Sequence, residues 1–129
     1  MAEALLRDAL KGQAEMTVES AGLGALVGHP ADEFAIELMR ERGIDIRSHR
    51  ARQLRPDMVK AADLILVMEH GHKQAIDAMD QAARGKVQRL GEWQDMEIGD
   101  PYRQPKEVFA DALQDIEDGL ADWVERLQS

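Results

Sequence analysis

The feature that most restricts the fold is an unbroken apolar run, Leu64-Ile65-Leu66-Val67-Met68, between Asp63 and Glu69. Because no polar residue alternates with these apolar ones, the run does not indicate a strand with one solvated face. Strands of this kind are typical of parallel sheets, in which both faces are covered. We therefore predict a buried strand over 63–69 in a parallel sheet.

Helical and strand patterns alternate before and after this run. Strands are also predicted over 16–19 and 87–90, and helices over 1–11, 30–42, 56–61, 72–84 and from 105 onward. Such alternation is typical of an α/β domain whose parallel sheet is flanked by helices. The chain has 129 residues and no internal repeat or linker, so we expect a single domain over 1–129 with about three visible strands.

The last predicted helix carries the clearest periodic signal. Its apolar residues recur at alternating steps of four and three, which places them on one face of a helix. They are Phe109, Leu113, Ile116, Leu120, Trp123 and Leu127.

Charge and cysteine content exclude several classes of function. The net charge of −9 argues against a nucleic-acid partner or an anionic membrane surface. The chain contains no cysteine, which removes disulfides, thiolate metal sites and a cysteine nucleophile from these residues. No segment resembles a signal peptide or a membrane span, so we expect a cytoplasmic protein. The basic stretch 40–60 either forms a solvated surface or attracts an anionic ligand.

The loops after the predicted strands are the places to look for a site, because parallel α/β sheets bind ligands at their carboxyl ends. These loops are 20–28, 69–72 and 91–104. The third contains Ile98-Gly99-Asp100-Pro101-Tyr102-Arg103, where Pro101 stiffens the backbone and disfavours a helical conformation for Asp100. A carboxyl group held in this way suits a general acid. The alternative is a plain surface turn, since Asp-Pro is a common turn dipeptide.

The second of these loops begins with potential metal ligands, Glu69-His70-Gly71-His72. Two histidines at positions i and i+2 beside one glutamate match no reliable zinc spacing. The position between a strand and a helix is enough to explain these polar residues. We therefore predict no metal and no other cofactor.

Four segments occur in an order that is specific for one family. They are Val18-Glu19-Ser20-Ala21-Gly22-Leu23-Gly24-Ala25-Leu26-Val27-Gly28, Ser48-His49-Arg50-Ala51-Arg52-Gln53-Leu54, Asp63-Leu64-Ile65-Leu66-Val67-Met68-Glu69 and Asp100-Pro101-Tyr102. With them the chain resembles a low-molecular-weight protein tyrosine phosphatase over essentially its whole length. The Leu-Gly-Ala-Leu-Val-Gly loop is most similar to the bacterial branch that acts with capsule and exopolysaccharide tyrosine kinases.

The resemblance implies a four-stranded parallel sheet flanked by helices, and phosphomonoester hydrolysis through a cysteinyl-phosphate without a metal. Asp100 matches the family's general acid, which protonates the tyrosine oxygen and later activates water. Tyr102 matches an aromatic residue beside the pocket, and Leu23 and Leu26 match the loop that lines the substrate's approach. His49 matches a histidine that braces the phosphate loop, a role close to that of an ordinary hydrogen-bonded core histidine.

The chain departs from the family pattern at its N-terminus. In the family, a strand and a Cys-x5-Arg-Ser loop precede the segment that matches Met1, and they supply the nucleophile and the phosphate-binding amides. We therefore expect an N-terminally truncated domain that is inactive by itself, because Asp100 has no covalent intermediate to form or break. The alternatives are a non-catalytic interaction module and a fragment completed in trans by another chain.

The resemblance also indicates the partners. It implies a phosphotyrosine protein, with a bacterial tyrosine kinase as one candidate, and neither nucleic acid nor membrane. In the family, the strand absent here lies inside the sheet, between the strands that match 16–19 and 63–69. Its loss would expose two sheet edges, which favours oligomers through those edges.

Overall fold

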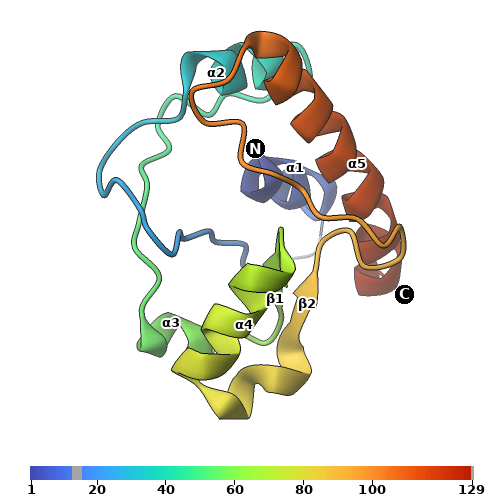
Figure 1. Cartoon of the computed structure of the whole chain (residues 1–129). Coiled ribbons are helices and arrows are strands. Elements are labelled where there is room, and N and C mark those ends of the chain that lie inside the picture. The colour runs from blue at the N-terminus through green and yellow to red at the C-terminus, as the bar shows by residue number, and fades with distance from the viewer. Residues whose placement is uncertain (13–15, 129) are drawn as a thin grey trace.

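A computed structural model describes residues 1–12 and 16–128 of the chain. Its elements, in chain order, are α1 (Ala2–Ala9), α2 (Glu33–Arg40), α3 (Pro56–Ala61), β1 (Ile65–Val67), α4 (His70–Met79), the 3-10 helix η1 (Gln81–Lys86), β2 (Val87–Arg89) and α5 (Lys106–Gln128). Strands β1 and β2 are parallel, with Ile65 opposite Val87 and Val67 opposite Arg89. The predicted α/β arrangement with parallel pairing is confirmed, and helices flank the small sheet (Figure 1).

The number of strands differs from the prediction. Within the described ranges the sheet has two strands instead of three, because 16–19 is not a strand. A strand needs a neighbouring backbone to pair with, and the backbone of 16–19 is not paired with β1 or β2. The guanidinium of Arg7 donates to the Val18 carbonyl, and that of Arg52 donates to the Ser20 carbonyl at 3.0 Å.

Two helix boundaries also differ from the prediction. Helix α2 begins at Glu33 instead of Pro30, because the Asp32 carboxylate caps it by accepting the Phe34 N–H at 2.9 Å. The helix predicted over 72–84 begins earlier, at His70, and ends at Met79. A separate 3-10 helix, η1, then leads into β2, and the Asp80 carboxylate caps it by accepting the Ala82 N–H.

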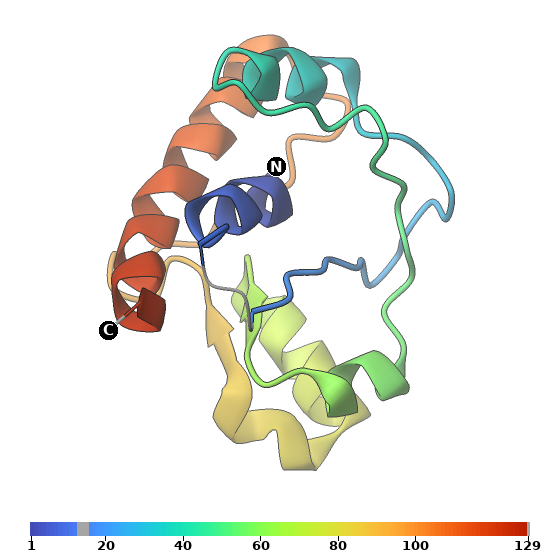
Figure 2. The same cartoon turned by 180° about the vertical axis from the view of Figure 1, so that it is seen from behind.

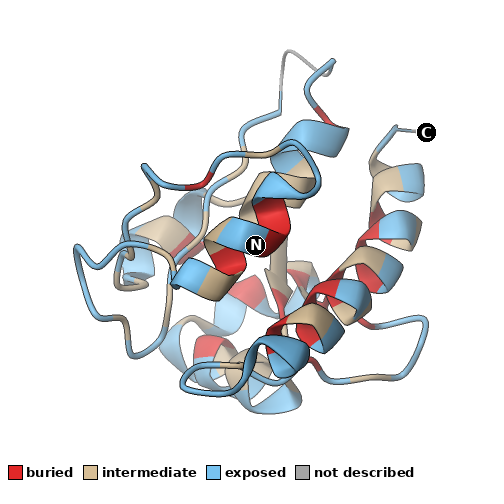
Figure 3. Cartoon of the chain, turned by 90° about the horizontal axis from the view of Figure 1, so that it is seen from above, coloured by how far each residue is buried: buried red, intermediate tan, exposed pale blue. Residues whose placement is uncertain are grey.

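Helix α5 organises the core. Its buried face packs on two clusters of apolar side chains, as its sequence period predicts. The first comprises Ala35, Leu38, Met39, Ile46, Phe109 and Leu113, and the second Leu90, Ile98, Ala112, Ile116, Leu120 and Trp123. The buried positions of α5 face the rest of the chain in Figure 3. No helix in the described part of the chain has the length and apolar character needed to cross a membrane.

Helix α1 packs against α5 and against both clusters. Met1 and Leu5 pack against both clusters, so the first turn of α1 is held from two sides. Both strand arrows point towards α1 in Figure 1, and Figure 2 shows the same relation from behind. The carboxyl end of the sheet and the start of α1 therefore lie in the same region of the molecule, where a ligand site is expected.

Gly119 allows α5 to approach the chain after β2, and we expect its replacement to be destabilising. A Cβ atom at this position would lie 2.8 Å from the Leu90 carbonyl oxygen. Gly119→Ala should therefore lower the free energy of unfolding by about 1–3 kcal/mol, even though alanine is the better helix former. Urea unfolding followed by circular dichroism measures the change.

Gly71 in α4 supplies the matched control. A Cβ atom added there would meet nothing within 4 Å. Gly71→Ala should leave stability unchanged or raise it by up to about 1 kcal/mol. A stabilising effect at both glycines would mean that the close contact at Gly119 is easily relieved.

Candidate functional site

Asp100 sits in a tight turn at the surface. Its carboxylate oxygen Oδ1 accepts the Tyr102 N–H at 3.0 Å, the hydrogen bond of an Asx turn. The turn closes when the Gln104 N–H donates to the Pro101 carbonyl at 2.8 Å. Asp100 therefore forms a surface turn, and this geometry is also compatible with a general acid. The carboxylate is exposed and ordered by its own turn, and its second oxygen is free for a reacting group.

The segment before Asp100 is attached to the carboxyl end of the sheet. The Ile98 N–H donates to the carbonyl of Met68, the residue after β1, at 3.0 Å. One residue earlier, the Glu97 carboxylate accepts the His70 N–H at 2.8 Å and so caps the start of α4. Ile98 is also buried in the α5 core. These contacts fix the base of the Asp100 turn to the end of the sheet where ligands bind.

Tyr102 projects from the same turn and is half exposed, at 50%. The guanidinium of Arg103 lies 5.3 Å from the centre of the Tyr102 ring, within the range of a cation–π contact. Arg103 has a φ of 63°, an uncommon backbone conformation for a residue that is not glycine. The turn thus presents an acid and an aromatic ring together at the surface.

Glu3, in the first turn of α1, holds His49 and the beginning of the 20–28 loop. Its carboxylate accepts the Ser20 hydroxyl at 3.0 Å and lies 3.6 Å from His49 Nδ1. The Glu3 side chain is only 16% exposed and also lies 3.7 Å from the Arg7 guanidinium. The His49 side chain is half-buried beside the first turn of α1.

The loop with Leu23 and Leu26 is paired to residues 50–54. Gly22 donates to Arg52 and accepts from Leu54, both at 2.8 Å. A second pairing joins Gly28 and His29 to Ala51 at 2.9 Å. Between these two attachments the apolar side chains remain outside: Leu23 is 36% exposed, Leu26 50% and Val27 66%.

The predicted site residues thus fall into two groups. Asp100 and Tyr102 belong to one turn, whereas Leu23, Leu26 and His49 belong to the segment that is paired around Gly22. No hydrogen bond or ion pair of the described residues joins the two groups directly. What they share is their position around the start of α1. The connection between β2 and α5, which contains Asp100, passes α1 in both views of Figures 1 and 2, and Glu3 holds the second group at α1.

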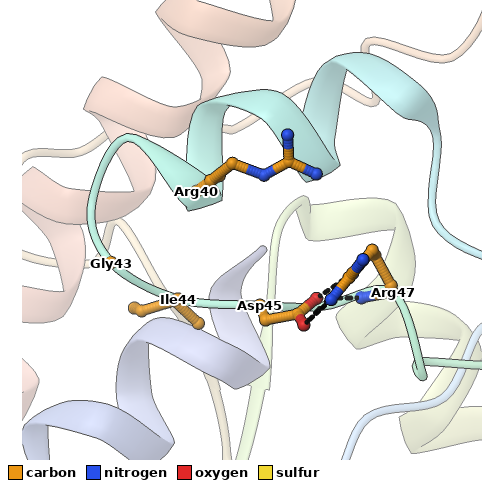
Figure 4. A pocket seen from close by; sticks show the side chains of 5 residues that line it. All are labelled: Arg40, Gly43, Ile44, Asp45 and Arg47. Atoms are coloured by element: carbon orange, nitrogen blue, oxygen red, sulfur yellow. Dashed lines mark hydrogen bonds and ion pairs between the residues drawn. The ribbon is translucent and has the colours of Figure 1, made fainter.

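The arginines of the basic stretch are largely paired within the chain. Arg47 makes a bidentate ion pair with Asp45, whose pKa this hydrogen bonding lowers to about 2. Arg42 pairs with Glu117 at 2.9 Å. A shallow pocket of about 490 Å³ lies beside the first pair, between the end of α2 and the following loop (Figure 4), and its lining is Arg40, Gly43, Ile44, Asp45 and Arg47. Because an ionised Asp45 lies in this pocket, the solvated-surface interpretation is favoured over an anion site.

Of the two histidines after β1, His72 lies beside the carboxylate of Glu69. His72 Nε2 lies 3.6 Å from Glu69 Oε2, a contact within the first turn of α4. The described residues contain no group of three or more His, Cys, Asp or Glu side chains arranged to hold a metal ion.

Three supporting residues were not singled out from the sequence: Glu3, Gln53 and Glu97. Each uses its side chain to bind a group distant in sequence, as when Gln53 binds Leu23 and Ala25. Gln53 lies inside a segment that resembles the family, which is the one signal that pointed to it. Glu3 and Glu97 look like ordinary surface acids in the sequence.

Comparisons with known proteins identify the family. A model of the low molecular weight phosphotyrosine protein phosphatase family matches residues 1–129. The probable low molecular weight protein-tyrosine-phosphatase EpsP of Ralstonia nicotianae is 48% identical over 129 residues, which make up 100% of this chain and 87% of that protein. Wzb of Escherichia coli K12, a low molecular weight protein-tyrosine-phosphatase, is 40% identical over 89% of this chain and 79% of its own length.

The same likeness holds in three dimensions. The solved structure of Vibrio vulnificus Wzb in complex with benzylphosphonate superposes with a TM-score of 0.89. The two chains are 39% identical, and the match covers 97% of this chain and 87% of the other.

Proposed function

This chain belongs to the low molecular weight phosphotyrosine protein phosphatase family, and we propose that it contributes the general acid and the substrate-facing rim for hydrolysis of phosphotyrosine. The observation that carries the proposal is the Asp100 turn. It supports an exposed carboxylate, ordered by the Tyr102 N–H, on a segment attached to the carboxyl end of β1. Membership of the family indicates phosphotyrosine hydrolysis as the reaction in which this carboxylate would act.

The proposed chemistry has two steps. A thiolate attacks phosphorus, the bond from phosphorus to the tyrosine oxygen breaks, and Asp100 gives its proton to that oxygen. A water molecule then attacks the cysteinyl-phosphate while Asp100 takes one of its protons, which releases phosphate and restores the thiolate. Asp100 thus acts first as general acid and then as general base, and its exposed free oxygen suits both roles.

The rim suits an aromatic phosphate ester. Leu23, Leu26 and Tyr102 present apolar and aromatic surface that is at least one-third exposed. Benzylphosphonate, which the Vibrio vulnificus Wzb structure contains, resembles phosphotyrosine, with a CH2 group in place of the phenolic oxygen between the ring and phosphorus. The proposed partner is therefore a phosphotyrosine protein. A bacterial tyrosine kinase of capsule or exopolysaccharide synthesis, in the cytoplasm, is the candidate that the family resemblance favours.

The residues of this chain lack a nucleophile for that reaction, because none of them is cysteine. We expect a polypeptide of residues 1–129 to release no phosphate from 4-nitrophenyl phosphate or from a phosphotyrosyl peptide above the uncatalysed background. Phosphate release over several hours, with an active member of the family as positive control, measures this. Turnover that survives repeated purification would contradict the proposed requirement for a thiolate from outside these residues.

A second experiment separates a missing nucleophile from a missing function. Adding a synthetic peptide that carries a strand followed by Cys-x5-Arg-Ser should restore hydrolysis, and the same peptide with serine in place of cysteine should not. If the cysteine peptide binds without producing turnover, the chain is better described as a binding module.

Completion by another chain is the second candidate, and the sheet favours it. Among the described residues, each of the two strands has one neighbour, and Ile65 and Leu66 of β1 are only partly buried. Parallel strands are normally covered on both sides, and a two-stranded sheet is marginal by itself. Light scattering at increasing concentration would detect self-association, whereas a monomer at all concentrations would argue against pairing between copies of this chain.

A further inference from the structure

The side chain of Gln53 spans the turn that carries the exposed leucines. Its amide oxygen accepts the Ala25 N–H at 3.0 Å, and its amide nitrogen donates to the Leu23 carbonyl at 2.7 Å. The same nitrogen lies 3.4 Å from the Leu54 carbonyl. One side chain, 28 to 30 residues away in sequence, thus satisfies a donor and an acceptor on the two sides of Gly24.

The backbone around Gln53 is fixed independently of this amide. Gly22 bridges to the chain on both sides of Gln53, through Arg52 and Leu54. The second pairing, of Gly28 and His29 with Ala51, closes the other end of the loop. The loop therefore remains attached at both ends without the Gln53 side chain. What the amide alone determines is the course of the backbone from Leu23 to Ala25.

That course decides where the exposed leucines stand. Leu23 is the residue whose carbonyl Gln53 holds, and Leu26 follows Ala25, whose N–H Gln53 binds. Both side chains are at least one-third exposed, and neither belongs to one of the three core clusters. Because packing is weak here, hydrogen bonds to the backbone are the main restraint on their positions.

From these contacts we propose that Gln53 is a positioning residue, which fixes the turn from Leu23 to Ala25 and thereby sets the place of Leu23 and Leu26 on the rim. The inference rests on the proposed function, because the positions of Leu23 and Leu26 affect catalysis only if these residues contact an aromatic phosphate. Gln53 itself contacts the loop backbone and acts on the substrate only through the leucines.

The test compares two variants of the polypeptide 1–129. Gln53→Met removes both hydrogen bonds at similar size, whereas Gln53→Glu keeps the acceptor for Ala25 and loses the donor to Leu23. In Gln53→Met, hydrogen exchange of the Ala25 amide should accelerate roughly five- to tenfold, and the methyl NMR signals of Leu23 and Leu26 should move and sharpen. In Gln53→Glu, protection of the Ala25 amide should persist while the Leu23 signals still move.

Gln94 provides a matched control. Its amide nitrogen also bridges two groups, the Asp118 carbonyl and the Asp122 carboxylate, on the far side of the core. Gln94→Met should leave the Ala25 amide and the leucine methyl signals unchanged. If Gln53→Met leaves Ala25 exchange unchanged, the proposal is wrong. If instead it accelerates exchange throughout the core, Gln53 supports the whole fold, and the positioning role is overturned.

A kinetic arm addresses the substrate once the cysteine peptide restores hydrolysis. Gln53→Met should then raise KM for a phosphotyrosyl peptide several-fold while kcat stays within about twofold, the pattern for loss of a binding contact. A several-fold fall in kcat with unchanged KM would overturn the positioning role. If the unmodified chain gains no activity, the proposed function fails, while the exchange measurements still decide what Gln53 does to the loop.

Discussion

Replacing Asp100 with asparagine should lower turnover by roughly 10²- to 10⁴-fold in the polypeptide supplemented with the Cys-x5-Arg-Ser peptide. Asparagine keeps an oxygen that can accept the Tyr102 N–H, so the Asx turn should survive. What the variant loses is the proton for the leaving oxygen. Initial rates of phosphate release under saturating substrate measure the effect, and circular dichroism verifies that the fold is retained.

Two comparisons make this prediction specific. The loss should be larger for phenyl phosphate than for 4-nitrophenyl phosphate, because nitrophenolate leaves readily without a proton. Asp80→Asn is the matched control, since Asp80 forms the same kind of turn by accepting the Ala82 N–H at the start of η1. It should leave turnover unchanged. An Asp100→Asn variant with full activity on both substrates would remove Asp100 from the general-acid role.

Truncating Leu113 should have the largest effect on stability among the predictions made from this fold. The side chain is 0% exposed and belongs to the cluster that joins α2 to α5. Leu113→Ala should lower the free energy of unfolding by about 2–5 kcal/mol, through lost burial and the cavity that remains. The expected signature is a lower urea midpoint with an unchanged dependence on urea concentration.

Leu26→Ala is the corresponding control and also tests the rim. Leu26 is 50% exposed, and its truncation should change stability by no more than about 0.5 kcal/mol. A loss comparable to that of Leu113→Ala would show that Leu26 is packed in the core. In that case it could not form part of an open surface for substrate.

The candidate site was only partly accessible from the sequence. The Asp100 turn could be predicted, because Asp-Pro restricts the backbone within a few residues and the geometry is local. The exposure of Leu23 and Leu26 could be inferred only through the family resemblance, since apolar residues in a loop otherwise indicate burial. Glu3 could not be identified as a support at all. Its importance arises when the fold brings Ser20 and His49 to the first turn of α1.

The sequence by itself determined the class of the fold and the limits of its chemistry. The apolar run at 64–68 indicated a strand of a parallel sheet, although Val67 is its one buried residue. The period of four and three in α5 required one buried face, and the absence of cysteine removed a thiolate nucleophile from these residues. These properties depend on residue type and near neighbours, so they can be read without knowing where distant segments lie.

The tertiary structure alone decided which backbone groups pair over long separations. Residues 16–19 have strand-like composition, yet they are not a strand in the structure, where the Arg7 side chain donates to the Val18 carbonyl. Glu97 caps α4 from 27 residues away, and Gln53 holds a loop 28 to 30 residues before it. A hydrogen bond of this kind needs two groups within about 3 Å, and only the packed fold sets that distance.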